Sequence, residues 1–297
     1  MSNPVLEFNP HAGYWFARNL DPRKADAIGL DWSKPAGCYY TDCVYAALAL
    51  WEYATPDAKD SMFLERMDVE ASWAIDYEGT KTFRAPPNEE LMPFQKAGIQ
   101  YALNRTNTLI GDQPGLGKTA QAIVYANELA AERVLVICPA SVRLQWEQMI
   151  LRWTWPRRHR TKTGFPVVNP ILRGNSAIYK GPAPCYWIIS YDLIARKPAI
   201  YEMFLRDNYD LVILDEIHFL RSPDANRTQH VLGAQHIDGV ADQGAHKLGL
   251  TGTPLPSRPR ECYTVTRSFC WDAIDRMSQS KFRGLYNDSM PVNGFKT

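Results

Sequence analysis

IGDQPGLGKTAQAI, residues 110–123, is the stretch that decides the fold of this chain. Gly115 and Gly117 stand one residue apart, and Lys118 and Thr119 follow directly. Glycines allow a backbone turn in which several N–H groups point at one anion, and the start of a following helix adds the positive end of its dipole. An apolar run precedes the turn and a helical pattern follows it. The stretch therefore predicts a strand, a phosphate-binding loop and a helix.

The loop matches the spacing G-x-x-x-x-G-K-[ST] except at its first position, where Asp112 replaces glycine. In this pattern the lysine reaches the outer phosphates of a nucleotide and the threonine ligates Mg²⁺. A chance glycine-rich turn is the alternative, and the position between a strand and a helix argues against it. The residues expected to bind the nucleotide here are Asp112, Gly115, Leu116, Gly117, Lys118, Thr119 and Ala120, with Thr119 also on Mg²⁺.

From about residue 91 onward, short apolar runs alternate with amphipathic segments. The runs RVLVICPA, CYWIISY, YDLVILDE and HKLGLTGTP predict buried parallel strands. Alternating strands and helices predict an α/β fold with a parallel sheet covered by helices on both faces. Residues 1–85 are rich in aromatic side chains and lack this alternation, so we expect a small α+β accessory domain there. The α/β domain is expected over residues 86–297, with Pro86 and Pro87 in a linker or turn before it.

A second motif lies in the segment LVILDEIHFLRS, residues 211–222. Asp215 and Glu216 end a predicted strand, and the carboxyl ends of parallel strands are where α/β sheets bind ligands. We expect Asp215 to hold Mg²⁺ through water and Glu216 to polarise the attacking water, with Lys118 as the third catalytic residue. These groups suffice because phosphoryl transfer requires mainly positioning and charge neutralisation. A solvated acidic loop end is the alternative, which the apolar run before it disfavours.

This chain resembles superfamily 2 helicases of the SWI/SNF-type branch in its loop, its acidic box and two further segments, VLVICPASVRLQWEQMILRW and IISYDLI, residues 134–153 and 188–194. In that branch these two segments flank the nucleic-acid track. In that branch the loop commonly reads Asp-Glu-Met-Gly-Leu-Gly-Lys-Thr, and this chain has Gln113 and Pro114 in the Glu-Met places. The acidic box resembles a DEAH-type box with Ile217 in place of alanine. The resemblance covers roughly residues 91–265. It implies the first RecA-like lobe of an ATP-dependent DNA helicase or translocase, with ATP and Mg²⁺ as cofactors.

The resemblance also implies roles for residues outside the loop. Gln95, in LMPFQKAGIQYAL, would recognise adenine, and an ordinary exposed helix glutamine is the alternative. His218 would link the nucleotide state to the motif LGLTGTPLPSRPRE, residues 248–261. There, Thr251 and Thr253 offer hydroxyls that would bond the acidic box and relay the presence of the γ-phosphate. A strand that ends in a Gly-Pro turn is the alternative for this segment.

A basic segment stands out in a chain whose net charge is +1. The stretch ILRWTWPRRHRTKTG interleaves two tryptophans with five basic residues. Such clusters attract phosphates, and indoles stack on bases. The resemblance implies that this region contacts the backbone of DNA, duplex or branched, rather than reading its sequence. A solvated basic loop whose tryptophans pack inward is the alternative. The candidate contacts are Arg143, Trp153, Trp155, Arg157, Arg158 and Arg160.

The aromatic segment before residue 85 resembles the accessory segment that precedes the motor in annealing-helicase-like proteins and their phage relatives. The resemblance implies help in engaging branched DNA, and a structural cap on the motor lobe is the alternative. The six cysteines form no CxxC pair, and the sequence has neither a targeting pattern nor a membrane-length apolar run. We therefore expect reduced thiols, no membrane partner, and a cytoplasmic protein of a bacterial or phage-infected cell.

Superfamily 2 motors have two RecA-like lobes, and nothing after Glu261 resembles the second one. We expect that lobe to come from a separate chain or a missing segment. Hydrolysis by this chain alone should then be weak, because an arginine finger contributes roughly 10³–10⁵ in rate in related systems. Two alternatives stay open: a nucleotide-gated DNA-binding module without hydrolysis of its own, and a P-loop NTPase of another class. The acidic box, the Thr-Gly-Thr-Pro segment and Gln95 argue against the last.

Overall fold

The chain divides into two compact units, Met1–Ala74 and Ile75–Thr297. The computed structural model describes residues 3–11, 13–155, 166–176, 185–234, 236–253, 259–271 and 278–285. Residues 75–85, which the sequence grouped with the accessory domain, lie in the second unit. Phe83 is buried in its core, and the backbone N–H of Arg84 donates to Glu128 at 2.5 Å.

The first unit is a small α+β domain built on an antiparallel sheet with the strand order β1-β2-β4-β3. Its strands are β1 (Val5–Asn9), β2 (Tyr14–Arg18), β3 (Asp31–Ser33) and β4 (Cys38–Thr41). Its helices are α1 (Pro22–Ile28), α2 (Val44–Leu48) and α3 (Pro56–Ser72), with the 3₁₀ turn η1 (Trp51–Tyr53). The expected small α+β fold of the amino-terminal region is confirmed.

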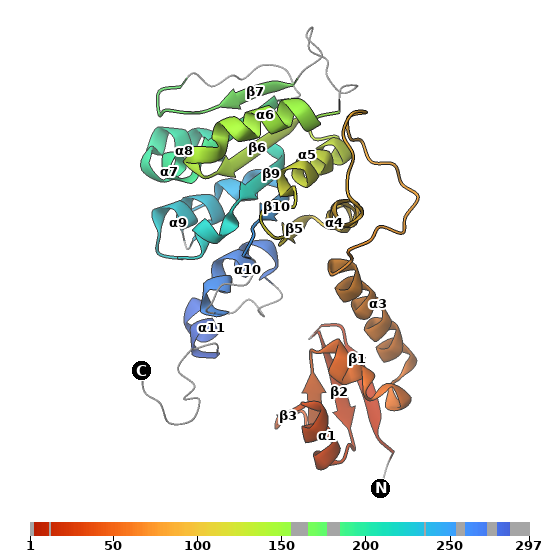
Figure 1. Ribbon diagram of the computed structural model, residues 1–297. Helices are drawn as coiled ribbons and strands as arrows, with labels where there is room; N and C mark the ends of the chain where they lie inside the picture. Colours follow the sequence, from red (N-terminus) through yellow and green to blue (C-terminus); the bar gives the residue numbers. More distant parts are fainter. Residues whose placement is uncertain are drawn as a thin grey trace, which may run out of the picture. The chain divides into compact units, whose positions relative to one another are not determined.

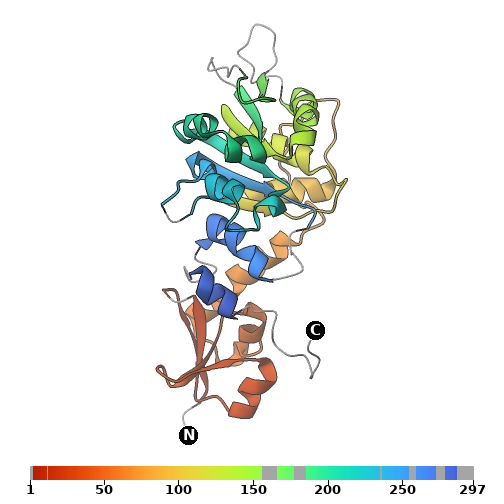
Figure 2. The ribbon, with the colours of Figure 1, turned by 90° about the vertical axis from the view of Figure 1, so that its left-hand side faces the viewer.

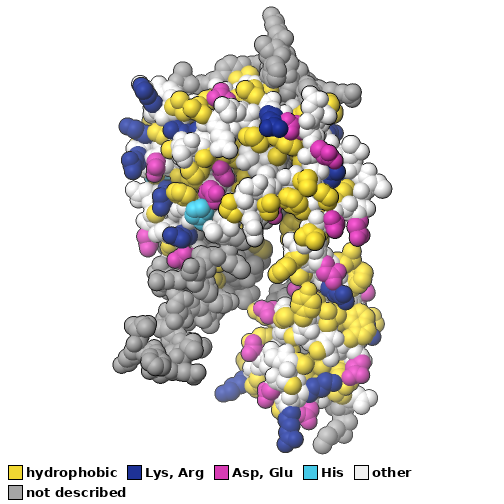
Figure 3. Space-filling view, viewed as in Figure 1, with side chains coloured by type: hydrophobic (Ala, Val, Ile, Leu, Met, Phe, Trp, Pro, Cys, Tyr) yellow, Lys and Arg dark blue, Asp and Glu magenta, His cyan; other side chains and the backbone are white. Residues whose placement is uncertain are grey.

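One face of this sheet carries the core of the first unit. Leu6 and Ala17 are register partners on β1 and β2, and both are buried with Trp15 against the helices. The indole N–H of Trp15 donates to the Ser61 hydroxyl at 2.9 Å, which fastens β2 to α3. The helix begins after Thr55, whose hydroxyl accepts a backbone N–H of the first turn. Figure 3 shows apolar side chains on the surface over α3.

The second unit contains a six-stranded parallel sheet with the order β5-β10-β9-β6-β8-β7 (Figure 1). The inner strands β6, β8 and β9 are almost wholly buried, as expected for strands covered on both faces. Its strands are β5 (Asn107–Ile110), β6 (Arg133–Cys138), β7 (Val167–Pro170), β8 (Cys185–Ser190), β9 (Tyr209–Asp215) and β10 (Gly244–Leu250). The predicted parallel α/β fold is confirmed.

Helices cover both faces of this sheet (Figure 2). One layer consists of α4 (Pro93–Leu103), α5 (Lys118–Leu129) and α6 (Arg143–Trp153). The other consists of α7 (Tyr191–Arg196), α8 (Pro198–Leu205) and α9 (Asn226–Leu232). The remaining elements are η2 (Ala140–Val142), η4 (Ile217–Leu220), η5 (Val240–Gln243), η6 (Pro259–Cys262), α10 (Tyr263–Phe269) and α11 (Gln279–Leu285).

Helix α5 is the most buried of the described helices in the second unit. Its residues from Ala120 to Asn127 are all buried, because the helix packs on the sheet and also contacts α4 and α6. Most of these buried residues are small or aliphatic, and alanine in particular favours the helical conformation. The longest described helix is α3, with 17 residues, and no helix in the described ranges has the length and apolarity that crossing a membrane requires.

Candidate nucleotide-binding site

The three motif segments follow the carboxyl ends of three adjacent strands. Leu250 of β10 is the register partner of Ile110 on β5 and of Asp215 on β9. The glycine-rich loop, the acidic box and the threonine motif therefore begin at one edge of the sheet. This is the edge at which parallel α/β sheets bind their ligands.

The glycine-rich loop has the backbone shape that the pattern predicts. Gly115 and Gly117 have φ values of 85° and 75°, a region that disfavours residues with a Cβ atom. A Cβ at Gly117 would also lie 2.5 Å from the amide nitrogen of Gln95, whereas one at Gly115 would meet no atom within 4 Å. The loop is thus packed on one side and open on the other. An open concave turn at a helix N-terminus fits a phosphate group.

The ammonium group of Lys118 lies against this loop. Its Nζ donates to the carbonyl oxygens of Asp112 at 2.7 Å and Gln113 at 3.1 Å. An ammonium group has three N–H donors, so one remains for a phosphate oxygen. Thr119 follows Lys118 in the first turn of α5, Ala120 is buried, and Leu116 is exposed.

Gln95 links α4 to the loop. Its side chain is buried, its Oε1 accepts the backbone N–H of Met92 at 2.9 Å, and its Nε2 donates to the carbonyl oxygen of Leu116 at 3.0 Å. The alternative of an exposed helix glutamine is thereby excluded. One N–H of the amide is left for an adenine ring, so recognition of adenine stays a prediction. The contact with the loop was not expected from the sequence.

Asp112, in the place of the missing first glycine, is fastened by a residue that the sequence did not single out. The amide of Gln121 donates to its Oδ2 at 2.7 Å. Gln121 is fully buried on α5, where the neighbouring side chains are apolar. A glutamine at a core position of a helix was the available signal, because a buried amide requires a polar partner.

Asp215 receives two hydrogen bonds from aromatic side chains. The indole N–H of Trp146 donates to its Oδ2 at 2.8 Å, and the hydroxyl of Tyr191 donates to its backbone oxygen at 2.7 Å. Burial raises the pKa of the Asp215 carboxyl, and the Trp146 hydrogen bond and the Lys118 charge act in the opposite direction. Neither aromatic donor was expected from the sequence.

A chain of polar contacts connects the acidic box to the threonine motif. Glu216 has a φ of 51°, and its carboxylate lies 3.1 Å from Nδ1 of His218. The same nitrogen lies 3.4 Å from the hydroxyl of Thr251, which also accepts the backbone N–H of Thr253 at 3.1 Å. The structure thus brings the three coupling candidates together. Their role as a relay stays a prediction.

The residues at this edge fit Mg²⁺ bound together with a nucleotide. Thr119 and Asp215 offer a hydroxyl and a carboxylate, the oxygen ligands that Mg²⁺ prefers. Within the described ranges no group of three or more His, Cys, Asp or Glu side chains is arranged to hold a metal. A Mg²⁺ ion here would therefore take its other ligands from phosphates and water, as is usual for nucleotide sites.

The nucleic-acid candidates have different environments. The guanidinium of Arg143, at the start of α6, donates to the carbonyl oxygens of Ala140 at 3.0 Å and Ile171 at 2.6 Å. Trp153 is 7% exposed and packs in the core, so its ring faces are not open to a base. Trp155 is partly exposed. Arg157, Arg158 and Arg160 lie outside the described residues.

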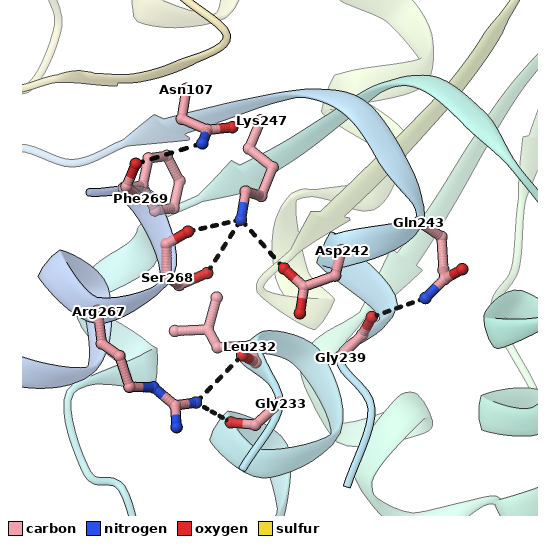
Figure 4. A network of polar contacts seen from close by, with 10 residues as sticks. All are labelled: Asn107, Leu232, Gly233, Gly239, Asp242, Gln243, Lys247, Arg267, Ser268 and Phe269. Atoms are coloured by element: carbon pink, nitrogen blue, oxygen red, sulfur yellow. Dashed lines mark hydrogen bonds and ion pairs between the residues drawn. The ribbon is translucent and has the colours of Figure 1, made fainter. Parts of the chain in front are cut away.

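A second polar network lies at the opposite end of β10 (Figure 4). The Nζ of Lys247 donates to Asp242 at 3.0 Å and to the carbonyl oxygen of Ser268 at 2.5 Å, and Asn107 donates to Phe269 at 3.2 Å. These bonds fasten the end of α10 to the sheet, beside a cavity of about 800 Å³. The network is structural and lies away from the candidate site.

Comparisons with known proteins agree with this geometry. A family model described as the SNF2-related domain matches residues 94–269. The chain is 35% identical over 181 residues to the SWI/SNF-related matrix-associated actin-dependent regulator of chromatin subfamily A-like protein 1 of Bos taurus, covering 59% of this chain and 17% of that protein. It is 28% identical over 181 residues to the human DNA annealing helicase and endonuclease ZRANB3, covering 59% of this chain and 15% of that protein.

The chain spans less than a quarter of the length of these relatives. The corresponding homolog of Caenorhabditis elegans is 32% identical over 185 residues, which cover 60% of this chain and 24% of the homolog. These relatives are animal proteins, so a bacterial or phage origin stays a prediction. The fold is similar to that of the Sulfolobus solfataricus SWI2/SNF2 ATPase core in complex with dsDNA. The TM-score is 0.52 at 19% identity, over 70% of this chain and 41% of that one.

Proposed function

The chain belongs to the SNF2-related family, and from this premise we propose that it is the first motor lobe of an ATP-dependent DNA translocase or helicase. It would bind Mg²⁺ and ATP at the carboxyl edge of its sheet and drive movement on, or remodelling of, DNA when a second lobe completes the site. The observation that carries the proposal is the common register of Ile110, Leu250 and Asp215, which brings three motifs to one edge.

The residues at this edge have complementary roles in the proposed reaction. The loop N–H groups and Lys118 bind and orient the phosphates. Thr119 and Asp215 hold Mg²⁺, which when bound would neutralise charge on the transferring phosphoryl group. Glu216 orients the attacking water, and its carboxylate is itself oriented by His218 at 3.1 Å. Positioning of this kind supplies most of the catalysis in phosphoryl transfer.

DNA is the partner that the similarities favour. One similar protein is named a DNA annealing helicase, and the similar solved structure is titled as a complex with double-stranded DNA. We propose that the start of α6 with Arg143, together with the basic segment after Trp153, contacts the phosphates of duplex or branched DNA. Contacts of this type position the protein without reading sequence.

The accessory unit carries more acidic than basic side chains. Residues 1–74 contain eleven Asp and Glu against six Lys and Arg. A net negative charge repels the phosphates of DNA, so most of the surface of this unit is unsuited to binding them. If this unit engages branched DNA, we propose that it does so through a limited surface rather than through its overall charge.

ATP hydrolysis by the purified 297-residue chain tests the proposal. It is measured without DNA and with single-stranded, duplex and forked DNA, for the wild type and Lys118→Ala. DNA-stimulated turnover that is lost in Lys118→Ala supports the motor function. ATP-dependent DNA binding without turnover supports the alternative of a nucleotide-gated DNA-binding module. If the chain neither hydrolyses ATP nor changes its DNA binding when ATP is added, both the motor function and the binding-module alternative are contradicted.

A further inference from the structure

Two buried aromatic residues from different elements hold Asp215, and they belong to segments that flank the expected nucleic-acid track. We propose that Trp146 and Tyr191 are positioning residues that couple occupancy of this track to the carboxylate that would hold Mg²⁺. The inference rests on the proposed function, and it adds two residues and a physical link that neither the motifs nor the similarities specify.

Trp146 fixes the orientation of the Asp215 carboxylate. The indole is 2% exposed, and its N–H can only donate, so the 2.8 Å contact with Oδ2 is a hydrogen bond to an acidic group. This bond engages Oδ2, and the backbone N–H of Glu216 also stabilises the same carboxyl. A carboxylate without this donor could rotate about its terminal torsion, which is broad. Trp146 therefore selects one orientation.

Tyr191 fixes the backbone at the same position. It is the first residue of α7, directly after β8, and its hydroxyl donates to the Asp215 backbone oxygen at 2.7 Å. Its ring stacks on Phe219 in η4, with ring centroids 6.0 Å apart and an interplanar angle of 6°. The end of β9 and the turn after the acidic box are thus held by a residue of the β8–α7 connection, which precedes β9 in the chain.

The link to nucleic acid runs through α6. Arg143 and Trp146 lie one turn apart at the start of this helix, so they move together. Hydrogen bonds weaken steeply when the distance or angle departs from the optimum, so a shift of α6 by about 1 Å would break the contact with Oδ2. Binding of phosphates at the start of α6 would in this way change the orientation of Asp215.

The test is the affinity for Mg·ADP with and without duplex DNA, measured on the 297-residue chain by titration of a fluorescent ADP. The ratio of the two affinities measures the coupling between the sites, which is typically about 5–150-fold in coupled proteins. We expect Trp146→Phe, which keeps an aromatic ring and loses the N–H, to bring this ratio close to 1. Its affinity for ADP in the presence of EDTA should be unchanged, because Asp215 acts only through Mg²⁺.

Trp153→Phe is the matched control. Trp153 lies on the same helix and is similarly buried, but the Asp215 carboxylate is held by Trp146 instead, so the control should keep the wild-type ratio. Tyr191→Phe loses only a hydroxyl, and it should lower the ratio even if Trp146→Phe does not fold. A wild-type ratio in both Trp146→Phe and Tyr191→Phe overturns the inference alone. Absence of any DNA effect in the wild type overturns the proposed function with it.

Discussion

The side-chain amide of Gln121 donates a 2.7 Å hydrogen bond to the carboxylate of Asp112, the residue that replaces the first glycine of the phosphate-loop pattern. Gln121 lies on α5, directly after the loop, and its Oε1 faces Gly98 on α4. Asp112, the one residue that departs from the glycine pattern, therefore has its own hydrogen-bond partner in the structure. The bond fastens the start of the loop to the helix that follows it.

Asp112→Ala should destabilise the second unit. The substitution leaves the Gln121 amide buried without its acceptor, which costs about 1–3 kcal/mol. Asp112→Asn keeps an acceptor oxygen and should cost clearly less. Urea unfolding of the wild type and both variants measures the difference. Equal stability of the wild type and Asp112→Ala would show that the bond does not hold the loop.

Gly98→Ala should lower stability although alanine is the better helix former. A Cβ at Gly98 would lie 2.6 Å from Oε1 of Gln121, and overpacking of this kind costs about 1–3 kcal/mol. Helix propensity alone would favour alanine by about 1 kcal/mol. In the Gln121→Ala background the contact is gone, so the same substitution should become stabilising. A double-mutant cycle by chemical denaturation measures the change of sign.

Gln95→Ala should weaken ATP binding by about tenfold, the loss expected when a hydrogen-bonded group is removed from a site. The loop loses its bond at the Leu116 carbonyl, so GTP binding should fall as well. If Gln95 also recognises adenine, the preference for ATP over GTP should fall toward 1. Gln100→Ala, on the same helix but bonded to Asn104, is the control. Unchanged binding of both nucleotides in Gln95→Ala would contradict both roles.

Thr251→Val should separate nucleotide binding from turnover. The hydroxyl joins Nδ1 of His218 to the backbone of Thr253, and valine has a similar shape without it. We expect DNA-stimulated ATP turnover to fall about tenfold, with little change in ATP affinity. Thr251→Ser keeps the hydroxyl and should retain turnover. A fall in affinity with unchanged turnover would place Thr251 in binding rather than coupling.

Alkylation of the cysteines checks the burial pattern and the expected reduced thiols. Cys43 and Cys270 are exposed, whereas Cys138 and Cys185 are buried. Burial raises the pKa of Cys185 to about 11, so its thiolate is scarce at pH 8 and becomes abundant only as the pH approaches that value. Iodoacetamide at pH 8 should label Cys43 and Cys270 first, as mass spectrometry can show. Equal labelling of Cys185 would contradict this packing.

The local patterns predicted the sheet and the position of the motifs. Apolar runs bounded by glycine, proline and acidic residues predicted β6, β8, β9 and β10, and the resemblance to the SWI/SNF-type branch is confirmed by the family match. Such runs identify strands covered on both faces, and parallel strands place their carboxyl ends together. The location of the site at the carboxyl edge of the sheet was therefore predictable without knowledge of any single side-chain contact.

The supporting contacts were not predictable in the same way. Trp146 and Asp215 are separated by 69 residues, and no periodic pattern records which side chain meets which across a sheet. For Trp153 a signal was present: Trp146, Ile150 and Trp153 recur at helical spacing, which predicts one buried face. That spacing favours a Trp153 side chain that packs in the core over one that stacks on nucleic-acid bases. The position of Phe83 was also not predictable. The composition of a linker does not reveal which of the two flanking units its residues pack against, and Phe83 packs in the core of the second unit.

The most direct test of the central claim is the equilibrium binding of ATP to the 297-residue chain, with Mg²⁺ and with EDTA. The variants are Lys118→Ala and Lys34→Ala, an exposed lysine of the first unit that serves as the control. We predict Mg²⁺-dependent binding that falls by at least about tenfold in Lys118→Ala and is unchanged in Lys34→Ala. No binding by the wild type, or equal binding by Lys118→Ala, would contradict the assignment of the carboxyl edge as a nucleotide site.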